Sequence, residues 1–235
     1  MVGGHGLLRS MIMTGRAVIG VMIFTFRSFF EDTSPDMAAW MNLPQQDELY
    51  NVRKAAQVIA YFALKQGGRA IDVVKAVKLT YLADRESLRR WGMPLLHEPH
   101  VALAQGPVNQ TTLDYINGKR ADPAGWSRII APREGNTVAV QTGLAAADLD
   151  EFSRAELEVL EQTWERYGSF KAAQLVGWTH NSANVPEWTK PRDDHKSTPI
   201  PLFEILRAVA FPDPEAAIER IEAQRDAERA FQQLR

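Results

Sequence analysis

Cysteine is missing from this chain of 235 residues. Without a thiol the protein cannot form a disulfide framework, a thiolate nucleophile or a zinc site that uses cysteine. A chain without disulfides is suited to a reducing compartment, so we expect a cytoplasmic protein.

The sequence also lacks a hydrophobic run long enough to cross a membrane. The longest uncharged stretch near its start, residues 17–26, is far shorter than the about 20 residues that a spanning helix needs. A secretory signal peptide would need small residues soon after this stretch, and the next small pair, Ala38-Ala39, comes well after it. We therefore expect no membrane span.

Residues 1–46 nevertheless have a helical pattern. On a helix, Arg9, Arg16 and Arg27 fall on one line, and apolar residues cover the opposite side. Two interpretations stay open for this leader. It is an amphipathic extension that binds a partner, or it is not part of the native protein and translation begins at an internal methionine.

Signatures of common enzymes and cofactor sites are absent too. The sequence has no G-x-S-x-G nucleophile elbow, no P-loop and no G-x-G-x-x-G fingerprint. Four histidines invite a metal interpretation, but their spacing matches no compact motif such as H-E-x-x-H: His97, His100, His180 and His195. We predict no catalytic residue, no metal and no other cofactor. The formal net charge of −2 argues against a surface built throughout to bind nucleic acid.

Apolar residues at helical spacing dominate the chain from residue 47 on. Asp47 is predicted to cap a first helix, which ends before Gly67. A second helix is predicted over residues 69–91, because a glycine and a proline follow it.

Strand signals are fewer. Residues 100–109 begin like a strand and are then broken by Gly106-Pro107, which predicts a tight loop leading into a helix over residues 110–117. Residues 126–142 contain two short β-branched runs around a polar turn, and this pattern predicts a β-hairpin.

The last third of the chain reads as helices around one long loop. Ser153 begins a capping box, and Ser169 is predicted to cap the next helix. The polar residues 179–199 are too many for an ordinary connection and predict a functional or mobile loop. A short helix is expected over residues 201–211, and Asp213 begins a final charged helix. Its predicted apolar anchors are Ile218, Ile221, Phe231 and Leu234.

The fold class that follows is mainly α with a small β-hairpin, an α+β fold. We expect a single compact helical domain with N- and C-terminal helical extensions. The predicted boundaries are a leader at 1–46, the domain at 47–211 and the charged C-terminal helix at 212–235.

One charged residue falls on the apolar face of the second helix. Asp84 lies within the arc of a helical wheel that Val77 and Leu88 cover. A carboxylate taken out of water without partners costs several kcal/mol, so Asp84 must be hydrogen-bonded or line a cavity. Two interpretations stay open: it fixes the loop at residues 104–109, or it belongs to a ligand or partner pocket.

Several stretches together resemble a known family. They are KLTYLADRESLRRWGMPL followed by HVALAQGPVN, then FSRAELEVLEQTWERYG, then LVGWTH and PEWTK. In this order and spacing they resemble the SocA-like Panacea domain, and the resemblance covers residues 47–211.

The resemblance implies an antitoxin of a bacterial toxin–antitoxin system. Such a protein is not an enzyme; it binds and neutralises a cognate protein toxin encoded next to it. The SocA type is in addition a proteolytic adaptor that delivers the bound toxin to the ClpXP protease. The motif residues expected to have a structural role here are Asp84, Gly106, Pro107 and Val108.

For contact with the toxin we predict side chains that are expected on the surface. Lys78, Arg85 and Arg89 share one stripe of the second helix, and His180 and Trp188 lie in the long loop. Arginine and exposed aromatic residues often dominate the binding energy of interfaces.

Two other functions stay open. A DNA-binding transcriptional regulator that binds its own promoter would use the basic stripe of the second helix, with a steep dependence on salt. A hydrolase or transferase would need a pocket that joins His180 or His100 to a carboxylate. The antitoxin is preferred, because the chain has no catalytic motif and no nucleic-acid reader module.

Overall fold

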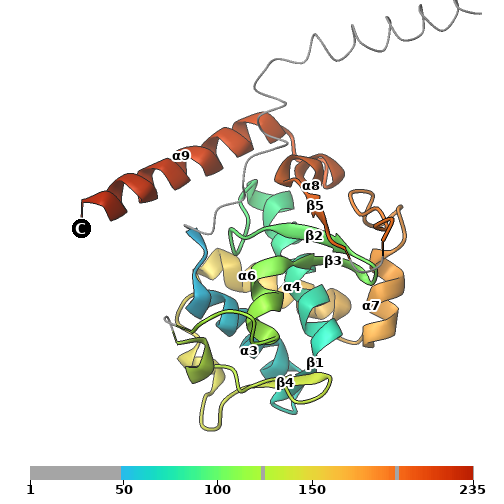
Figure 1. The fold of residues 1–235 in the computed structure, drawn as a ribbon, viewed down its shortest axis with the longest axis vertical. Coiled ribbons are helices and arrows are strands. Elements are labelled where there is room, and N and C mark those ends of the chain that lie inside the picture. The colour runs from blue at the N-terminus through green and yellow to red at the C-terminus, as the bar shows by residue number, and fades with distance from the viewer. Residues whose placement is uncertain (1–48, 123–124, 194–195, 235) are drawn as a thin grey trace, which may run out of the picture. The chain divides into compact units, whose positions relative to one another are not determined.

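The computed structural model describes residues 49–122, 125–193 and 196–234. α-Helices form most of it, and the strands make two small antiparallel sheets (Figure 1). The helices are α3 (Val52–Lys65), α4 (Val73–Trp91), α5 (Gln110–Ile116), α6 (Arg154–Tyr167), α7 (Ala172–Thr179), α8 (Leu202–Ala208) and α9 (Pro214–Gln233). The strands are β1 (Ala70–Asp72), β2 (His100–Leu103), β3 (Gly106–Asn109), β4 (Thr137–Ala139) and β5 (Thr198–Ile200). The mainly α fold class with a small β component is confirmed.

Helix α4 lies in the middle of the fold. It contacts α3, α6, α7, α8 and strand β3. Because neighbours cover it on several sides, 13 of its 19 residues are buried, including Lys75 and Lys78. The stripe that was expected to face solvent is therefore largely inside the protein. Large side chains that are fully buried in this core include Ile59, Phe62, Leu79, Leu88, Leu160 and Leu175.

The start of the predicted second helix is a strand instead. β1 pairs antiparallel with β4, with Ile71 opposite Val138. Asp72 then caps α4, because its carboxylate accepts a hydrogen bond of 3.0 Å from the N–H of Lys75. The helix begins at Val73 and ends, as predicted, at Gly92, whose left-handed backbone conformation closes it.

The residues after α4 form a hairpin where the sequence predicted a loop. β2 and β3 pair antiparallel, with Val101 opposite Val108, and β5 pairs with the other side of β2. Gly106 and Pro107 are thus strand residues. Proline is tolerated at this position because β3 is an edge strand, which leaves its outer backbone unpaired.

The hairpin predicted over residues 126–142 forms only in part. An isolated antiparallel bridge joins Ile130 to Val140, but the second arm, β4, pairs mainly with β1. The first arm starts as a 3-10 turn, η2 (Trp126–Arg128), and not as a strand. The Asp122 carboxylate causes this turn, because it accepts hydrogen bonds from three successive backbone N–H groups, those of residues 125–127.

One of the two predicted serine caps is present. Ser153 Oγ accepts a hydrogen bond of 3.3 Å from the N–H of Glu156, and the Glu156 carboxylate accepts one of 2.8 Å from the N–H of Ser153. The cap predicted at Ser169 is wrong, since α7 begins at Ala172 with Lys171 at its N-cap. The chain first makes a turn after α6, which moves the start of α7 along the sequence.

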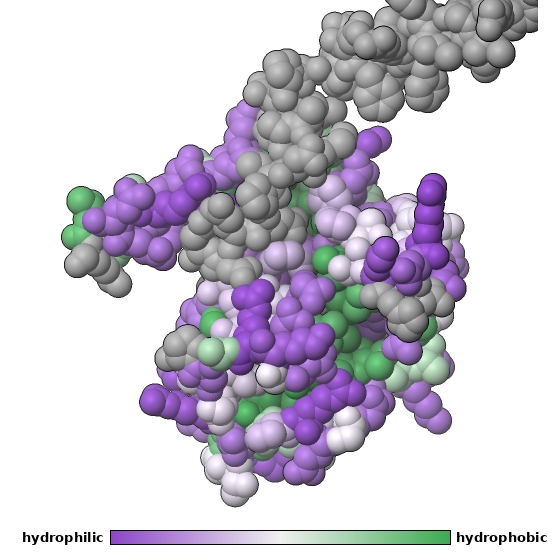
Figure 2. All heavy atoms as spheres, in the orientation of Figure 1, coloured by the Kyte–Doolittle hydropathy of each residue, from purple (hydrophilic) through white to green (hydrophobic). Residues whose placement is uncertain are grey.

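The last helix begins where the sequence predicted. Asp213 accepts a hydrogen bond of 2.9 Å from the N–H of Ala216, and Pro214 occupies the first turn. The surface over α9 is mainly hydrophilic (Figure 2).

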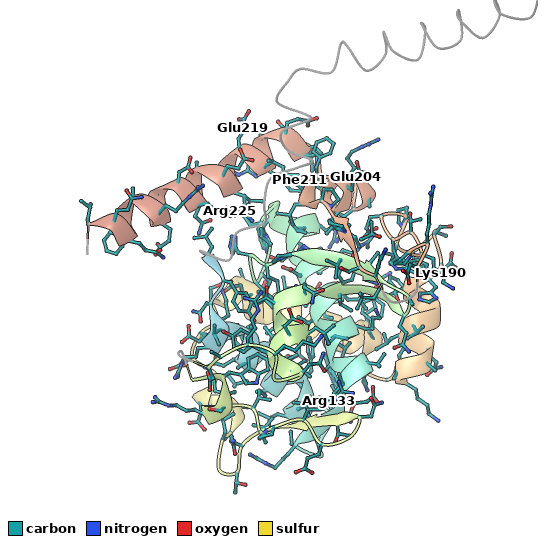
Figure 3. The ribbon with its side chains drawn as sticks, in the orientation of Figure 1. Arg133, Lys190, Glu204, Phe211, Glu219 and Arg225 are labelled. Atoms are coloured by element: carbon teal, nitrogen blue, oxygen red, sulfur yellow. The ribbon has the colours of Figure 1, made fainter. Side chains whose placement is uncertain are left out.

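Helix α9 is anchored only as far as Arg225. Its buried residues are Ala217, Ile218, Ile221 and Arg225. Arg225 points from the helix toward the rest of the fold, whereas Glu219 points away from it (Figure 3). Phe231 and Leu234, predicted as anchors, are 52% and 86% exposed, so that part of the prediction is wrong.

Other predictions concern the beginning of the chain. The leader at 1–46 and the cap at Asp47 lie outside the described residues. The first described helix, α3, is capped by Asn51 and ends before Gly67 as expected. In the described ranges, no helix combines the length and the apolar composition that crossing a bilayer requires.

Candidate functional site

The Asp84 carboxylate lies in the core of the fold with no exposed surface. One of its oxygens accepts hydrogen bonds from the backbone N–H groups of Leu95 and Leu96, in the turn after α4. The other oxygen lies 2.6 Å from His100 Nε2 and 2.9 Å from Asn109 Nδ2. Asp84 thus ties α4 to the turn that follows it and to both strands of the β2–β3 hairpin.

These donors keep Asp84 ionised. Burial acts to raise its pKa, but the His100 ring and the hydrogen bonds from His100, Asn109 and Leu95 outweigh burial and lower the pKa. The bonds correspond to the first of the two interpretations, a buried residue that fixes a segment of the chain. The segment that it fixes includes the turn at 95–96, which the sequence did not indicate.

A second buried carboxylate lies near this network. Glu98 accepts hydrogen bonds of 2.7 Å from the N–H of Thr112 and of 2.5 Å from Thr112 Oγ1, in the first turn of α5. Burial raises the pKa of Glu98 to about 8 against the effect of these hydrogen bonds, and the charge of Asp84 adds to the rise. Glu98 therefore binds a proton through most of the neutral range.

Lys78 lies inside the fold, and its predicted exposure is wrong. Its ammonium group donates a hydrogen bond of 2.7 Å to the carbonyl of Pro107, and burial lowers its pKa to about 7. Gly106 leaves room for this contact. A Cβ at Gly106 would lie 2.9 Å from Lys78 Nζ and 2.8 Å from Thr179 Oγ1. The point where α4, β3 and α7 meet thus requires glycine.

A buried ion pair attaches the loop after α7 to α4. The Glu187 side chain is fully buried and accepts hydrogen bonds of 2.7 Å from both Arg85 Nε and the Tyr81 hydroxyl. Burial, followed by the Glu187 charge, raises the pKa of Tyr81 well above its ordinary value, so Tyr81 stays a neutral donor. The guanidinium group of Arg85 is therefore occupied by a partner within the chain.

Two aromatic rings attach the same loop to the hairpin. His180 and Trp188 stack with their centroids 4.2 Å apart and their planes 7° from parallel. Trp188 Nε1 donates a hydrogen bond of 3.2 Å to the carbonyl of Leu103 in β2. Burial and the charge of Lys78 lower the pKa of His180, which favours a neutral ring in this stack.

A groove of about 190 Å³ lies between α4 and α6. It is lined by Leu82, Arg85, Glu86, Arg89, Gln162, Thr163, Arg166 and Tyr167. Glu86 forms ion pairs with Arg89, at 2.6 Å, and with Arg90, at 2.7 Å. The Arg166 guanidinium lies over the Tyr167 ring, 5.2 Å from its centroid. We call this the arginine groove.

Comparison with known families identifies the segment that carries these features. Residues 77–188 match the family model described as antitoxin SocA-like, Panacea domain. The likeness to the SocA-like Panacea domain thus covers just under half of the chain. The family supports an antitoxin role for the chain. Neither the curated proteins nor the solved structures that were compared gave a match.

The matched segment includes most of the polar contacts described above. It begins in α4 and ends at Trp188, and so it contains the Asp84 network, the β2–β3 hairpin and both partners of the Arg85–Glu187 pair. The wider boundaries expected for the Panacea domain, 47–211, enclose this segment and stay a prediction.

The structure separates the five residues predicted for toxin contact. Lys78 is buried, and the Arg85 side chain is only 15% exposed. Arg89 is 50% exposed and lines the arginine groove. His180 and Trp188 are partly buried against each other, and hold the loop in place. The structure thus brings Arg85 and Arg89 together in the groove, whereas the other three lie at the hairpin.

The motif residues of the Panacea domain are all buried. Gly106 and Pro107 contact Lys78, and Val108 pairs with Val101 across the hairpin. Together with Asp84 they lie where the hairpin joins α4, which suits the structural role that we expected for them.

Two residues of the site were missed by sequence reasoning. Glu187 lies in the quoted PEWTK stretch, and a carboxylate between proline and tryptophan was a signal of burial that we did not use. Arg166 directly precedes Tyr167 in α6, but no local pattern shows that α6 faces Arg85 and Arg89.

The enzyme hypothesis required a pocket in which His180 or His100 lies next to a carboxylate. The structure has such a pair, but not in a pocket. His100 contacts the carboxylate of Asp84, but both side chains are fully buried and neither lines the arginine groove. Within the described ranges, no three His, Cys, Asp or Glu residues are placed so that they could hold a metal ion. His195, named in the metal interpretation, lies outside those ranges.

Replacing Asp84 will strongly destabilise the Panacea domain. Asp84→Ala leaves the donors of Leu95, His100 and Asn109 without their acceptor, and we expect a loss of about 3–5 kcal/mol in the free energy of unfolding. Urea denaturation followed by circular dichroism measures this loss. The control is Asp226→Ala on α9, where the carboxylate is 72% exposed and little change is expected. Equal stability of the two variants would contradict the role of Asp84.

Replacing Gly106 will also destabilise the domain, for a steric reason. Gly106→Ala adds a Cβ against Lys78 and Thr179 at a backbone φ of +100°, and we expect a loss of about 2–4 kcal/mol. The matched control is Gly118→Ala, at φ +65° with open space around it, where strain alone costs about 1 kcal/mol. If urea denaturation gives equal losses for both, the close contact at Gly106 is not important.

Removing the titration of Glu98 will change how stability depends on pH. Because the pKa of Glu98 in the folded protein, about 8, exceeds its ordinary value of 4.5, its contribution is complete below pH 4.5 and is lost as the pH rises to about 8. Glu98→Gln lacks this titration, so its melting temperature relative to wild type should rise between about pH 5 and pH 9. The control is Glu158→Gln at an exposed position of α6. A constant difference across this range would show that Glu98 is ionised in the folded protein.

Proposed function

We propose that this chain is a bacterial, cytoplasmic antitoxin that binds and neutralises a cognate protein toxin encoded next to it. The observation that carries the proposal is the match of residues 77–188 to the SocA-like Panacea domain.

The geometry of the described residues fits a binding role. The ionisable pair that most resembles catalytic machinery, Asp84 and His100, is fully buried and serves the packing of the hairpin. The arginine groove, in contrast, is open to solvent, and two of its arginines, Arg89 and Arg85, are already held in place by Glu86 and Glu187. Preorganised arginines on a surface are typical of protein–protein interfaces.

Two routes of neutralisation can follow from the same contact. The antitoxin can block the toxin by remaining bound to it, or it can act as an adaptor that delivers the toxin to the ClpXP protease. Both routes need a stable complex, but only the second needs the protease.

A growth assay tests the proposal and separates the two routes. The neighbouring gene is expressed in bacterial cells with and without this chain on a second plasmid, and we expect growth arrest that this chain relieves. In a strain without ClpXP, relief that persists indicates blocking, and relief that disappears indicates delivery. Asp84→Ala, which is expected to be strongly destabilised, is the negative control.

Two results would contradict the proposal. The neighbouring gene product could be harmless, or it could arrest growth that this chain does not relieve. In either case the alternative, a transcriptional regulator that binds its own promoter, is tested by the affinity of the purified chain for that promoter DNA at two salt concentrations.

A further inference from the structure

The arginine groove contains more positive than negative charge. Arg85 is paired with Glu187, while Arg89 and Arg90 share one carboxylate, that of Glu86. Arg166 forms no ion pair with any residue that the structure describes, and its guanidinium group lies over the face of the Tyr167 ring. Three guanidinium groups and one carboxylate line the groove, and their partners Glu187 and Arg90 lie outside the lining. With these partners counted, four guanidinium groups accompany two carboxylates, which leaves a surplus of two positive charges at and beside the groove.

Charged side chains of α4 and α6 lie close to the same residue, Tyr167. Tyr167 lies in the lining of the groove, and the pKa of its hydroxyl, raised first by burial, is affected by Arg166, Arg85 and Glu86 together. Arg166 from α6 and Arg85 from α4 thus act on the same small volume. A negative group in that volume would be attracted from both helices.

The guanidinium groups retain hydrogen-bond donors for a ligand. Arg89 uses its Nε and Nη2 atoms toward Glu86, and so its Nη1 donors stay available. Arg166 spends none of its donors on a described carboxylate. Arginine binds carboxylates with two parallel hydrogen bonds, which gives both strength and orientation.

A carboxylate suits this groove better than a nucleic-acid backbone. Its volume of about 190 Å³ gives room for a single acidic side chain. The carboxylate of Glu158, on the same helix as Arg166, is 55% exposed and would repel phosphates along α6. Glu86 adds a further negative charge within the groove itself.

We propose that the arginine groove receives an acidic side chain of the toxin, which Arg89 and Arg166 bind as a carboxylate. This inference rests on the proposed function, because it names the surface and the chemistry of the same partner. Arg85, held by Glu187, supplies positive charge at the side of the groove formed by α4.

Charge reversal in the groove tests this inference. Arg166→Glu and Arg89→Glu are compared with wild type by isothermal titration against the purified product of the neighbouring gene. We expect each variant to raise the Kd on the order of 30-fold, as for a hot-spot arginine. The matched control is Arg154→Glu, which makes the same charge change on α6 at a side chain that is 95% exposed and outside the groove. Its Kd should stay within about twofold of wild type.

A charge swap identifies the partner residue. Acidic residues of the toxin are changed one at a time to arginine, and one such change should restore binding to Arg166→Glu while weakening binding to wild type. Circular dichroism melts confirm that the variants are folded. Because Arg89 and Arg166 are exposed or half-exposed, their replacement should leave the melting temperature close to that of wild type.

The outcomes separate the two proposals. If wild type binds the toxin and both groove variants bind it equally well, the inference about the groove is wrong and the antitoxin function stands. If the variants lose affinity for promoter DNA and keep affinity for the toxin, the groove binds phosphate and the inference is also wrong. If wild type does not bind the toxin, the proposed function fails, and the inference that rests on it fails too.

Discussion

The negative charge of Asp84 is the constraint around which the centre of the fold is arranged. A carboxylate without exposed surface is stable only where hydrogen-bond donors replace the water that it has lost. The donors come from the turn after α4, from His100 in β2 and from Asn109 at the end of β3. Because each donor belongs to a different element, satisfying one charge fixes the hairpin relative to α4. Apolar packing alone would allow the hairpin to shift with little change in buried area, whereas hydrogen bonds depend on direction.

The buried Glu187 carboxylate fixes the loop after α7 in the same way, because it too needs hydrogen-bond donors in place of water. Buried ion pairs contribute little net stability on average, but a carboxylate that must meet Arg85 and Tyr81 specifies where the loop lies. Helix α4 takes part in both buried networks. It carries the Asp84 carboxylate, and its Tyr81 and Arg85 donate hydrogen bonds to the Glu187 carboxylate. The hairpin and the loop are thus fastened to one helix and, through Trp188, to each other. These contacts begin in α4, end at Trp188 and lie within the segment 77–188 that matches the family.

Features that depend on neighbouring residues could be predicted from the sequence. The caps at Ser153 and Asp213 need only a backbone N–H three residues further on, and the position of Asp84 on an apolar face needs only helical geometry. The partners of Asp84 could not be predicted, because they lie 11 to 25 residues away and depend on how the hairpin folds back. The burial of Lys78 was missed for the same reason. A lysine beside an apolar stripe normally faces solvent, but here Gly106 and the carbonyl of Pro107 lie against the ammonium group of Lys78.

The arginine groove depends on these buried contacts for its order. Glu187, itself hydrogen-bonded by Tyr81, holds Arg85, and Glu86 holds Arg89, so two of the guanidinium groups are in position before any ligand arrives. Such preorganisation lowers the entropic cost of binding, because fewer side chains lose freedom in the complex. Arg166 is the exposed member and has no carboxylate of its own among the described residues. A partner that covers Arg166 without a negative charge would remove water from the guanidinium group and offer it no ion pair. Binding of such a partner is therefore disfavoured. The compensated arginines therefore make the groove rigid, and the uncompensated one makes it selective.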